Sequence, residues 1–136
     1  MKNLSTAIYS KIAGSLFSTA IGGRFYKGRV PQGTVWPFAV YYIITDNPRD
    51  TFTEKLEEVT IQFSIFSMKS GTSEIEDIFT SLRALFDNCS LTITGNTHVT
   101  MDRQGASLTS VPADTEEGTG EYWQYDVDYS IVMQKN

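Results

Sequence analysis

Two carboxylates near the end of the chain are the first candidates for a metal or acid–base site. Asp126 and Asp128 lie two residues apart in a segment of alternating polarity, so both share one strand face with Gln124. A calcium ion needs at least about six oxygen ligands, and the sequence identifies no second half of such a site. We therefore expect these carboxylates on a solvated or subunit-facing strand surface, with no metal bound.

The single histidine and the single cysteine do not form a nucleophile–base pair. His98 has no cysteine or serine partner at a spacing typical of catalysis, and Cys89 follows the end of a predicted helix as a lone thiol. One cysteine excludes an internal disulfide and a cysteine-based zinc cluster. His98 is predicted to be a structural or surface histidine, and Cys89 a buried residue, because a lone cysteine is more often a small buried side chain than a nucleophile.

Two further patterns could carry chemistry, and neither is complete. Gly118-Thr119-Gly120 lacks the Lys-Ser/Thr pair of a phosphate-binding loop and does not open a helix. Glu54, Glu57 and Glu58 could include a glycosidase-type carboxylate pair, but a charged run before a strand is typical of a solvated surface. The sequence therefore predicts no enzyme activity and no cofactor.

Basic and aromatic residues alternate near the end of the first quarter of the chain. Arg24, Lys27 and Arg29 are interleaved with Phe25 and Tyr26, a combination that can bind single-stranded nucleic acid. The whole chain has 11 basic and 16 acidic residues and a net charge of −5, which argues against a general DNA-wrapping role. A salt-bridged edge or a subunit contact is the interpretation that we favour.

These groups must be positioned by one domain, residues 1–136, whose 40% hydrophobic and 20% charged content is typical of a folded protein. Apolar residues four apart predict an N-terminal helix over about residues 3–20. A secretory leader would also fit this segment loosely, but a clear cleavage site is missing. No run approaches the ~18–20 apolar residues of a membrane span, so we expect no membrane partner.

A second helix is predicted over about residues 73–88, where Ser73 and Glu76 match a capping box and apolar residues follow on one face. Residues 46–58 are predicted to form a long solvated loop or a hairpin tip, and residues 111–121 an exposed loop. Residues 24–26 fit a brief strand or a turn. A short strand is predicted at 91–94, and longer strands are predicted at 38–45, 59–66, 99–108 and 122–134.

The predicted order α-β-β-α-β-β-β indicates an α+β fold. The strand connections suit a mixed or mostly antiparallel β-sheet, with the two helices packed on one face. In the last strand Trp123, Tyr125, Val127 and Tyr129 alternate with polar residues, so one face of this strand is expected to be buried.

The first third of the chain carries a recognisable series of motifs. After the N-terminal helix come Gly23-Arg24-Phe25-Tyr26, then Val30-Pro31-Gln32-Gly33, then Trp36-Pro37-Phe38 at the start of a hydrophobic strand. This series resembles the tail completion proteins of long-tailed bacteriophages, also called tail terminator or tail-to-head joining proteins. The later strands, helix and polar loop fit the same family as a pattern over essentially the whole chain.

The resemblance implies structural work in a virion. Such proteins form rings, usually hexamers, that cap the head-proximal end of the tail tube and stop its polymerisation. The implied partners are other copies of the chain, the tail tube protein and a head-closure or connector protein, while DNA passes through the ring without sequence-specific binding. The implied location is the phage tail or neck, after assembly in the bacterial host cytoplasm.

A closed ring uses two different surface patches on each subunit. The candidate interface residues are Arg24, Pro31, Gln32, Trp36 and Phe52. Trp36 is either an anchor of this interface or a core residue at the start of a strand. Candidate acids facing the channel, where like charge would keep DNA from adhering, are Asp114, Glu116 and Glu117, or alternatively acids of residues 46–58.

Three other functions are compatible with the sequence. A head-closure or other neck component would share the fold class and the ring. A small ligand-binding or enzymatic domain would belong to a different class, and so would a single-strand-binding module built on Arg24, Lys27 and Arg29.

Overall fold

The computed structural model is the basis of the description that follows. It describes residues 2–48, 50, 54–69, 71–87, 89–115 and 118–135.

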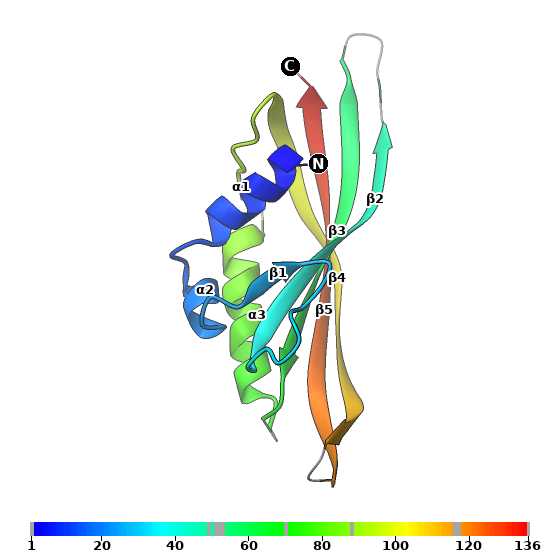
Figure 1. Cartoon of the computed structure of the whole chain (residues 1–136). Helices are drawn as coiled ribbons and strands as arrows, with labels where there is room; N and C mark the ends of the chain where they lie inside the picture. The colour runs from blue at the N-terminus through cyan, green and yellow to red at the C-terminus, as the bar shows by residue number, and fades with distance from the viewer. Residues whose placement is uncertain are drawn as a thin grey trace.

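Three helices in the described part of the chain lie on one side of a β-sheet (Figure 1). They are α1 (Lys2–Ile12), α2 (Leu16–Ala20) and α3 (Ser73–Phe86). Each helix turns apolar side chains toward the sheet, which agrees with the predicted packing on one face. Among the residues that the structure describes, no helix is long and apolar enough to cross a membrane.

The N-terminal helix predicted over residues 3–20 is wrong in one respect, because the chain forms two helices there. α1 ends at Ile12, and Gly14 adopts a left-handed φ of 74°, which glycine tolerates without strain. Ser15 then caps α2, since its side chain accepts a hydrogen bond from the backbone N–H of Ser18 at 3.1 Å. The apolar spacing continues through the break and therefore conceals it.

The prediction of α3 is confirmed, but the capping box is wrong. Ser73 is the first helical residue, and the N-cap residue Thr72 makes no side-chain capping bond. The first turn is held by Glu74 instead, which accepts a hydrogen bond from the Ser67 hydroxyl at 2.7 Å and pairs with Lys69 at 3.3 Å. Acidic side chains in this turn also interact favourably with the helix dipole.

One five-stranded sheet has the spatial order β1-β2-β3-β5-β4. Its strands are β1 (Phe25–Lys27), β2 (Phe38–Pro48), β3 (Leu56–Ser67), β4 (Asn96–Thr115) and β5 (Gly118–Lys135). β1 pairs in parallel with β2, and every other pairing is antiparallel. The α+β class with a mixed sheet is thus confirmed.

Most of the described residues in the loops predicted at 46–58 and 111–121 belong to strands. β2 continues as far as Pro48, opposite Glu57, so the hairpin alternative for 46–58 is confirmed in the described residues. β4 and β5 remain paired as far as Thr115 and Gly118. Ladder hydrogen bonds use backbone groups, so polar side chains in these segments did not prevent pairing.

The short strand predicted at 91–94 is wrong. Only Ile93 makes a bridge, to Asn96, across a tight turn in which Gly95 has a φ of 81°. The strand predicted at 99–108 is instead the middle of β4, which begins at Asn96.

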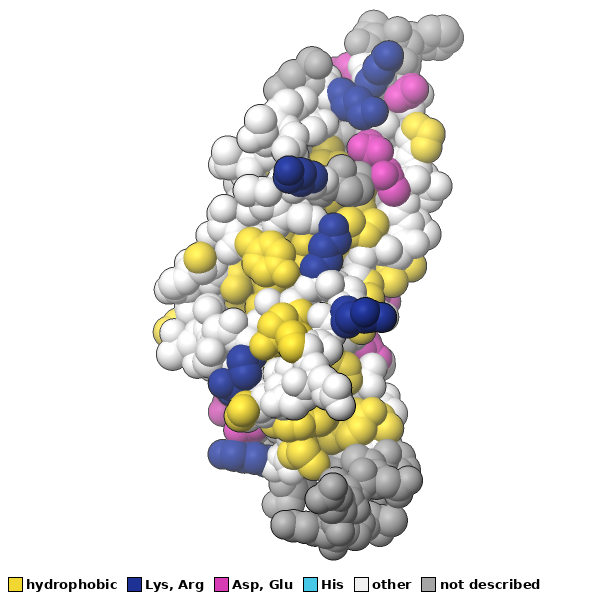
Figure 2. Space-filling view, viewed as in Figure 1, with side chains coloured by type: hydrophobic (Ala, Val, Ile, Leu, Met, Phe, Trp, Pro, Cys, Tyr) yellow, Lys and Arg dark blue, Asp and Glu magenta, His cyan; other side chains and the backbone are white. Residues whose placement is uncertain are grey.

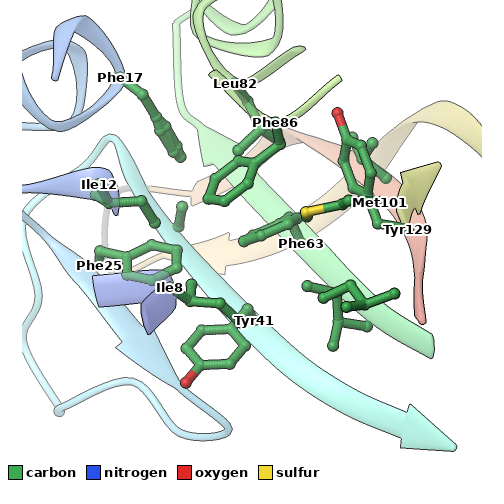
Figure 3. Close-up of a cluster of buried hydrophobic side chains, with 14 of the residues drawn as sticks. Ile8, Ile12, Phe17, Phe25, Tyr41, Phe63, Leu82, Phe86, Met101 and Tyr129 are labelled. Atoms are coloured by element: carbon green, nitrogen blue, oxygen red, sulfur yellow. The ribbon is translucent and has the colours of Figure 1, made fainter. Parts of the chain in front are cut away.

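The hydrophobic core lies between the helices and one face of the sheet (Figure 3). Phe63 is at its centre, with its ring 4.9 Å from the ring of Phe86 and 5.8 Å from that of Tyr129. The predicted alternation of the last strand is confirmed. The buried β5 residues on this face, all at most 2% exposed, are Val127, Tyr129, Ile131 and Met133.

Candidate assembly surfaces

The sheet face opposite the helices carries polar side chains on the neighbouring strands β3 and β5. Ser64 and Asp126 lie one residue away from core positions, so their side chains point to this helix-free face. The Ser64 hydroxyl donates to the Asp126 carboxylate at 2.7 Å, and the Gln124 amide donates to the same carboxylate at 2.9 Å. The helix-free face is therefore an ordered polar surface.

The predicted sharing of one face by Gln124, Asp126 and Asp128 is confirmed by the register of β5. Asp126 is satisfied by neutral donors of the same chain rather than by further carboxylates. In the part of the chain that the structure describes, no group of three or more His, Cys, Asp or Glu residues could hold a metal ion. This arrangement provides carboxylates on a surface.

An aromatic cluster covers one end of the helix-free face. The Trp36 ring lies 4.8 Å from Phe38, 5.3 Å from Tyr122 and 6.1 Å from Phe66, and these three residues come from β2, β5 and β3. Trp36 thus packs on its own chain and joins three strands, but it remains partly exposed. Its role as an interface anchor stays a prediction.

Arg24 fixes the start of β2. Its Nε donates to the Pro37 carbonyl at 2.9 Å, and its side chain is half-buried. A Cβ added to Gly22 would lie 2.5 Å from the Arg24 guanidinium, and Gly22 and Gly23 both have left-handed φ values, 62° and 76°. Gly22 therefore leaves room for the Arg24 side chain to fold back over the backbone, whereas Gly23 is favoured by its φ alone.

The other predicted interface and channel residues differ in what the structure describes. Pro31 and Gln32 are exposed in the loop between β1 and β2, where the Thr34 hydroxyl donates to the Pro31 carbonyl. Asp114 belongs to β4, but its side chain lies outside the described part. The residues that lie outside it entirely are Phe52, Glu116 and Glu117.

One of the two rings in the basic and aromatic cluster around β1 is not accessible for stacking on bases. Phe25 is 8% exposed, and its ring stacks on Tyr41 in the core at 5.3 Å. Lys27 donates to the Ser5 hydroxyl of α1 at 2.9 Å and stays exposed. Single-stranded nucleic acid binding requires accessible rings, so this geometry removes one main support for that alternative.

His98 and Cys89 occupy structural positions, as the sequence predicts. Nδ1 of His98 accepts a hydrogen bond from the Leu91 N–H at 3.3 Å, and burial lowers the pKa of the imidazole. The Cys89 thiol contacts the sulfur of Met101 at 3.5 Å, and burial raises its pKa. A raised thiol pKa opposes nucleophilic chemistry at neutral pH.

Two carboxyl groups meet on the β2–β3 hairpin. The pKa of Glu57 is raised, first because its side chain forms a hydrogen bond with Asp46 and then because of burial. Of the three glutamates in the charged run, Glu57 therefore has a carboxyl partner on the neighbouring strand. The hydrogen bond between Glu57 and Asp46 joins β3 to β2, so it is a structural contact within the hairpin.

The family of the chain follows from comparison with known proteins. The family described as tail completion protein gp17 matches residues 6–134, which is nearly the whole chain. The chain belongs to this family. It is a family of structural phage tail proteins, as the motifs between Gly23 and Phe38 suggest.

Two solved structures share the fold of this tail completion protein. A chain from a structure described as the virion of a native gene transfer agent particle has 13% sequence identity and a TM-score of 0.73, with 96% of this chain and 94% of that chain covered. A second solved chain has 12% identity and a TM-score of 0.54 with the same coverages. No curated protein sequence matches.

One structural group of the tail completion protein is absent from the sequence predictions. The Tyr129 hydroxyl donates to the Asp87 carboxylate at 2.6 Å, and Arg103 lies 3.5 Å from the same carboxylate. This group joins the end of α3 to β4 and β5. The three residues are far apart in sequence, so only the strand pairing of Arg103 opposite Tyr129 could have indicated it.

Proposed function

We propose that this protein caps the head-proximal end of the phage tail tube as a homo-oligomeric ring, a hexamer in our proposal. The ring stops polymerisation of the tube protein and provides the surface that the head joins, and DNA passes through its centre. The observation that carries this proposal is the match of the tail completion family to residues 6–134.

The place of the ring is the virion, at the junction of tail and head. The fold of the chain is shared with a chain of a gene transfer agent virion over 96% of its length, which supports a role as a virion component. Assembly takes place in the bacterial host cytoplasm, before the tail meets the head.

The shape of the sheet suits a protein with two axial partners. The end of β2 and the start of β3 lie at one end of the sheet, whereas the end of β4 and the start of β5 lie at the opposite end (Figure 1). One end would contact the tail tube protein and the other a head-closure or connector protein. Because the helices occupy one face alone, the rest of the sheet surface is available for contacts within the ring.

Contacts between subunits use the segment between β1 and β2. Pro31 and Gln32 are exposed there and Trp36 is partly exposed, which supports a contact with the next subunit. Arg24 shapes this segment through Pro37, and Phe52, which lies between β2 and β3 in the sequence, belongs to the contact in this proposal. The acids that face the channel in this proposal are Asp114, Glu116 and Glu117.

Disruption of the gene, followed by electron microscopy of the particles, tests this function. Overlong tail tubes beside DNA-filled, unattached heads are expected, and supplying the wild-type gene in trans should restore normal tails. Tails of normal length beside heads that leak DNA would contradict termination and assign the protein to head closure. Intact, infectious particles would contradict both roles.

A further inference from the structure

The charges of this chain are separated along the sequence. All 16 acidic residues lie at or after Asp46, so the first 45 residues contain none. The same 45 residues contain five of the 11 basic residues of the chain, which are Lys2, Lys11, Arg24, Lys27 and Arg29. The net charge of −5 therefore conceals a positive N-terminal third and a strongly negative remainder.

The fold turns this separation into a basic edge. β1 is an edge strand of the sheet, and the exposed side chains of Lys27 and Arg29 lie in β1 and directly after it. Figure 2 shows Lys and Arg side chains along the surface over α1, β1 and the segment that follows. We call Lys27 and Arg29 the basic edge; no acid precedes Asp46 to neutralise it within this third of the chain.

The opposite edge of the sheet carries an acidic patch. Asp102 is exposed on the edge strand β4, opposite Ser130, and it points to the helix-free face. Asp128 shares this face on the neighbouring strand, and its cross-strand neighbour is Gly105, which has no side chain. We call Asp102, Asp126 and Asp128 the acidic patch.

No basic side chain of the same sheet face compensates the acidic patch. None of the strand residues on the helix-free face that the structure describes is Lys or Arg. Arg103 follows Asp102 but points to the other face, where it pairs with Asp87 at 3.5 Å and lies 5.8 Å from the Phe79 ring. The groups that bind Asp126 are the hydroxyl of Ser64 and the amide of Gln124, which are neutral donors.

We propose that the basic edge of one copy of this chain docks on the acidic patch of the next copy. This inference rests on the proposed ring and assigns its subunit contact. The basic edge lies at the edge strand β1, whereas the acidic patch lies on the helix-free face of β5 and β4 at the other side of the sheet, so each copy presents two different surfaces, as a head-to-tail ring requires. Complementary charge fixes the register and direction of docking more than its strength, and like surfaces of two copies repel one another.

Charge reversal on each side tests the docking. One double variant carries Lys27→Glu and Arg29→Glu, and the other carries Asp102→Lys and Asp128→Lys. Asp126 is left unchanged because Ser64 and Gln124 bind it. The matched control is Glu76→Lys with Asp77→Lys, two exposed acids in α3. Melting curves followed by circular dichroism verify that each variant folds.

The readout is the association of the full chain, measured by analytical ultracentrifugation at about 50 mM and about 500 mM NaCl, because salt screens such contacts. We expect wild type and control to associate at low salt, and each reversed variant alone to associate at least about tenfold more weakly. An equimolar mixture of the two reversed variants should associate again. The acidic edge of the first variant then meets the basic patch of the second, and the basic edge of the second meets the acidic patch of the first.

Three results would overturn the docking. They are a wild-type monomer at low salt, reversed variants that associate as well as the control, and a mixture of folded variants that fails to associate. Duplex DNA bound by wild type and lost in Lys27→Glu/Arg29→Glu, with association unchanged, would assign the basic edge to DNA instead. Tail length after gene disruption tests the proposed function separately, since overlong tails would support termination even if the subunits dock elsewhere.

Discussion

The two faces of the sheet are built from the same strands but differ in almost every property. On the helix-covered face Phe63 and Tyr129 are fully buried among aromatic and aliphatic side chains. On the helix-free face their neighbours in sequence are polar: Ser64 is 2% exposed and donates to Asp126, and Asp128 is half-buried. The difference indicates that apolar burial stabilises the helix-covered face, whereas hydrogen bonds hold the polar part of the other face.

The alternation of the strands enforces this division. Ser64 lies between Phe63 and Ile65, so a shift of one residue in the pairing of β3 would move every core side chain of β3 to the polar face. The register is therefore specified by burial. The surface chemistry can change without loss of the core.

The largest effect is expected from removing a ring at the centre of the helix-covered face. Phe63→Ala should lower the free energy of unfolding by about 3–5 kcal/mol, because a buried ring is replaced by a cavity. Urea unfolding monitored by circular dichroism measures this. The control is Gln62→Ala, since Gln62 directly precedes Phe63 and lies on the other face. A loss of stability as large as that of Phe63→Ala would remove the distinction between the faces.

A smaller effect is expected at the aromatic cluster of the helix-free face. Trp36→Ala should cost about 2 kcal/mol, since Trp36 contacts Phe38, Phe66 and Tyr122 but remains partly exposed. The same unfolding measurement applies, with Trp36→Phe as the conservative variant. If Trp36→Ala leaves stability unchanged, the indole ring of Trp36 does not stabilise the fold of the single chain and serves contacts between subunits alone.

The hydrogen bond between the end of α3 and the sheet should contribute less. Tyr129→Phe keeps the ring in the core and removes the hydroxyl that donates to Asp87, so a loss of about 1 kcal/mol is expected. Thermal unfolding of both proteins at equal ionic strength provides the comparison. A variant as stable as wild type would mean that Arg103 alone satisfies Asp87.

The smallest effect concerns pH. Burial lowers the pKa of His98 below its ordinary value of 6.5, so the unfolded chain binds a proton more readily than the folded one. The associated stability is present above about pH 6.5 and is lost as the pH falls through this value toward the folded pKa. His98→Gln should therefore lose less stability than wild type between about pH 7 and pH 5, and equal losses would contradict the assignment.

The sequence predicted the elements whose side chains alternate with one clear period. The α3 helix and the buried face of β5 are of this kind, because burial dictates their residues directly. The break at Gly14 was missed since the apolar spacing of α1 continues into α2. The extension of β4 to Thr115 was missed because backbone pairing leaves no hydrophobic signal in a polar hairpin.

The candidate surfaces were predicted in part. The shared face of Asp126 and Asp128 follows from spacing alone, and it is present. The contacts of Arg24 with Pro37 and of Trp36 with Tyr122 depend on how distant segments pack, so spacing could not predict them. The absence of acids before Asp46 was readable from the sequence, but its meaning required the knowledge that β1 and β4 are opposite edges.

The ring that we propose for this chain lies at the head-proximal end of the tail. Cryo-electron microscopy of tails purified before head attachment would reveal it. We expect one closed ring of this chain at that end of the tube, with the basic edge of each subunit against the acidic patch of the next. A chain that is absent from the tails, or that lies at the opposite end or along the whole tube, would contradict it.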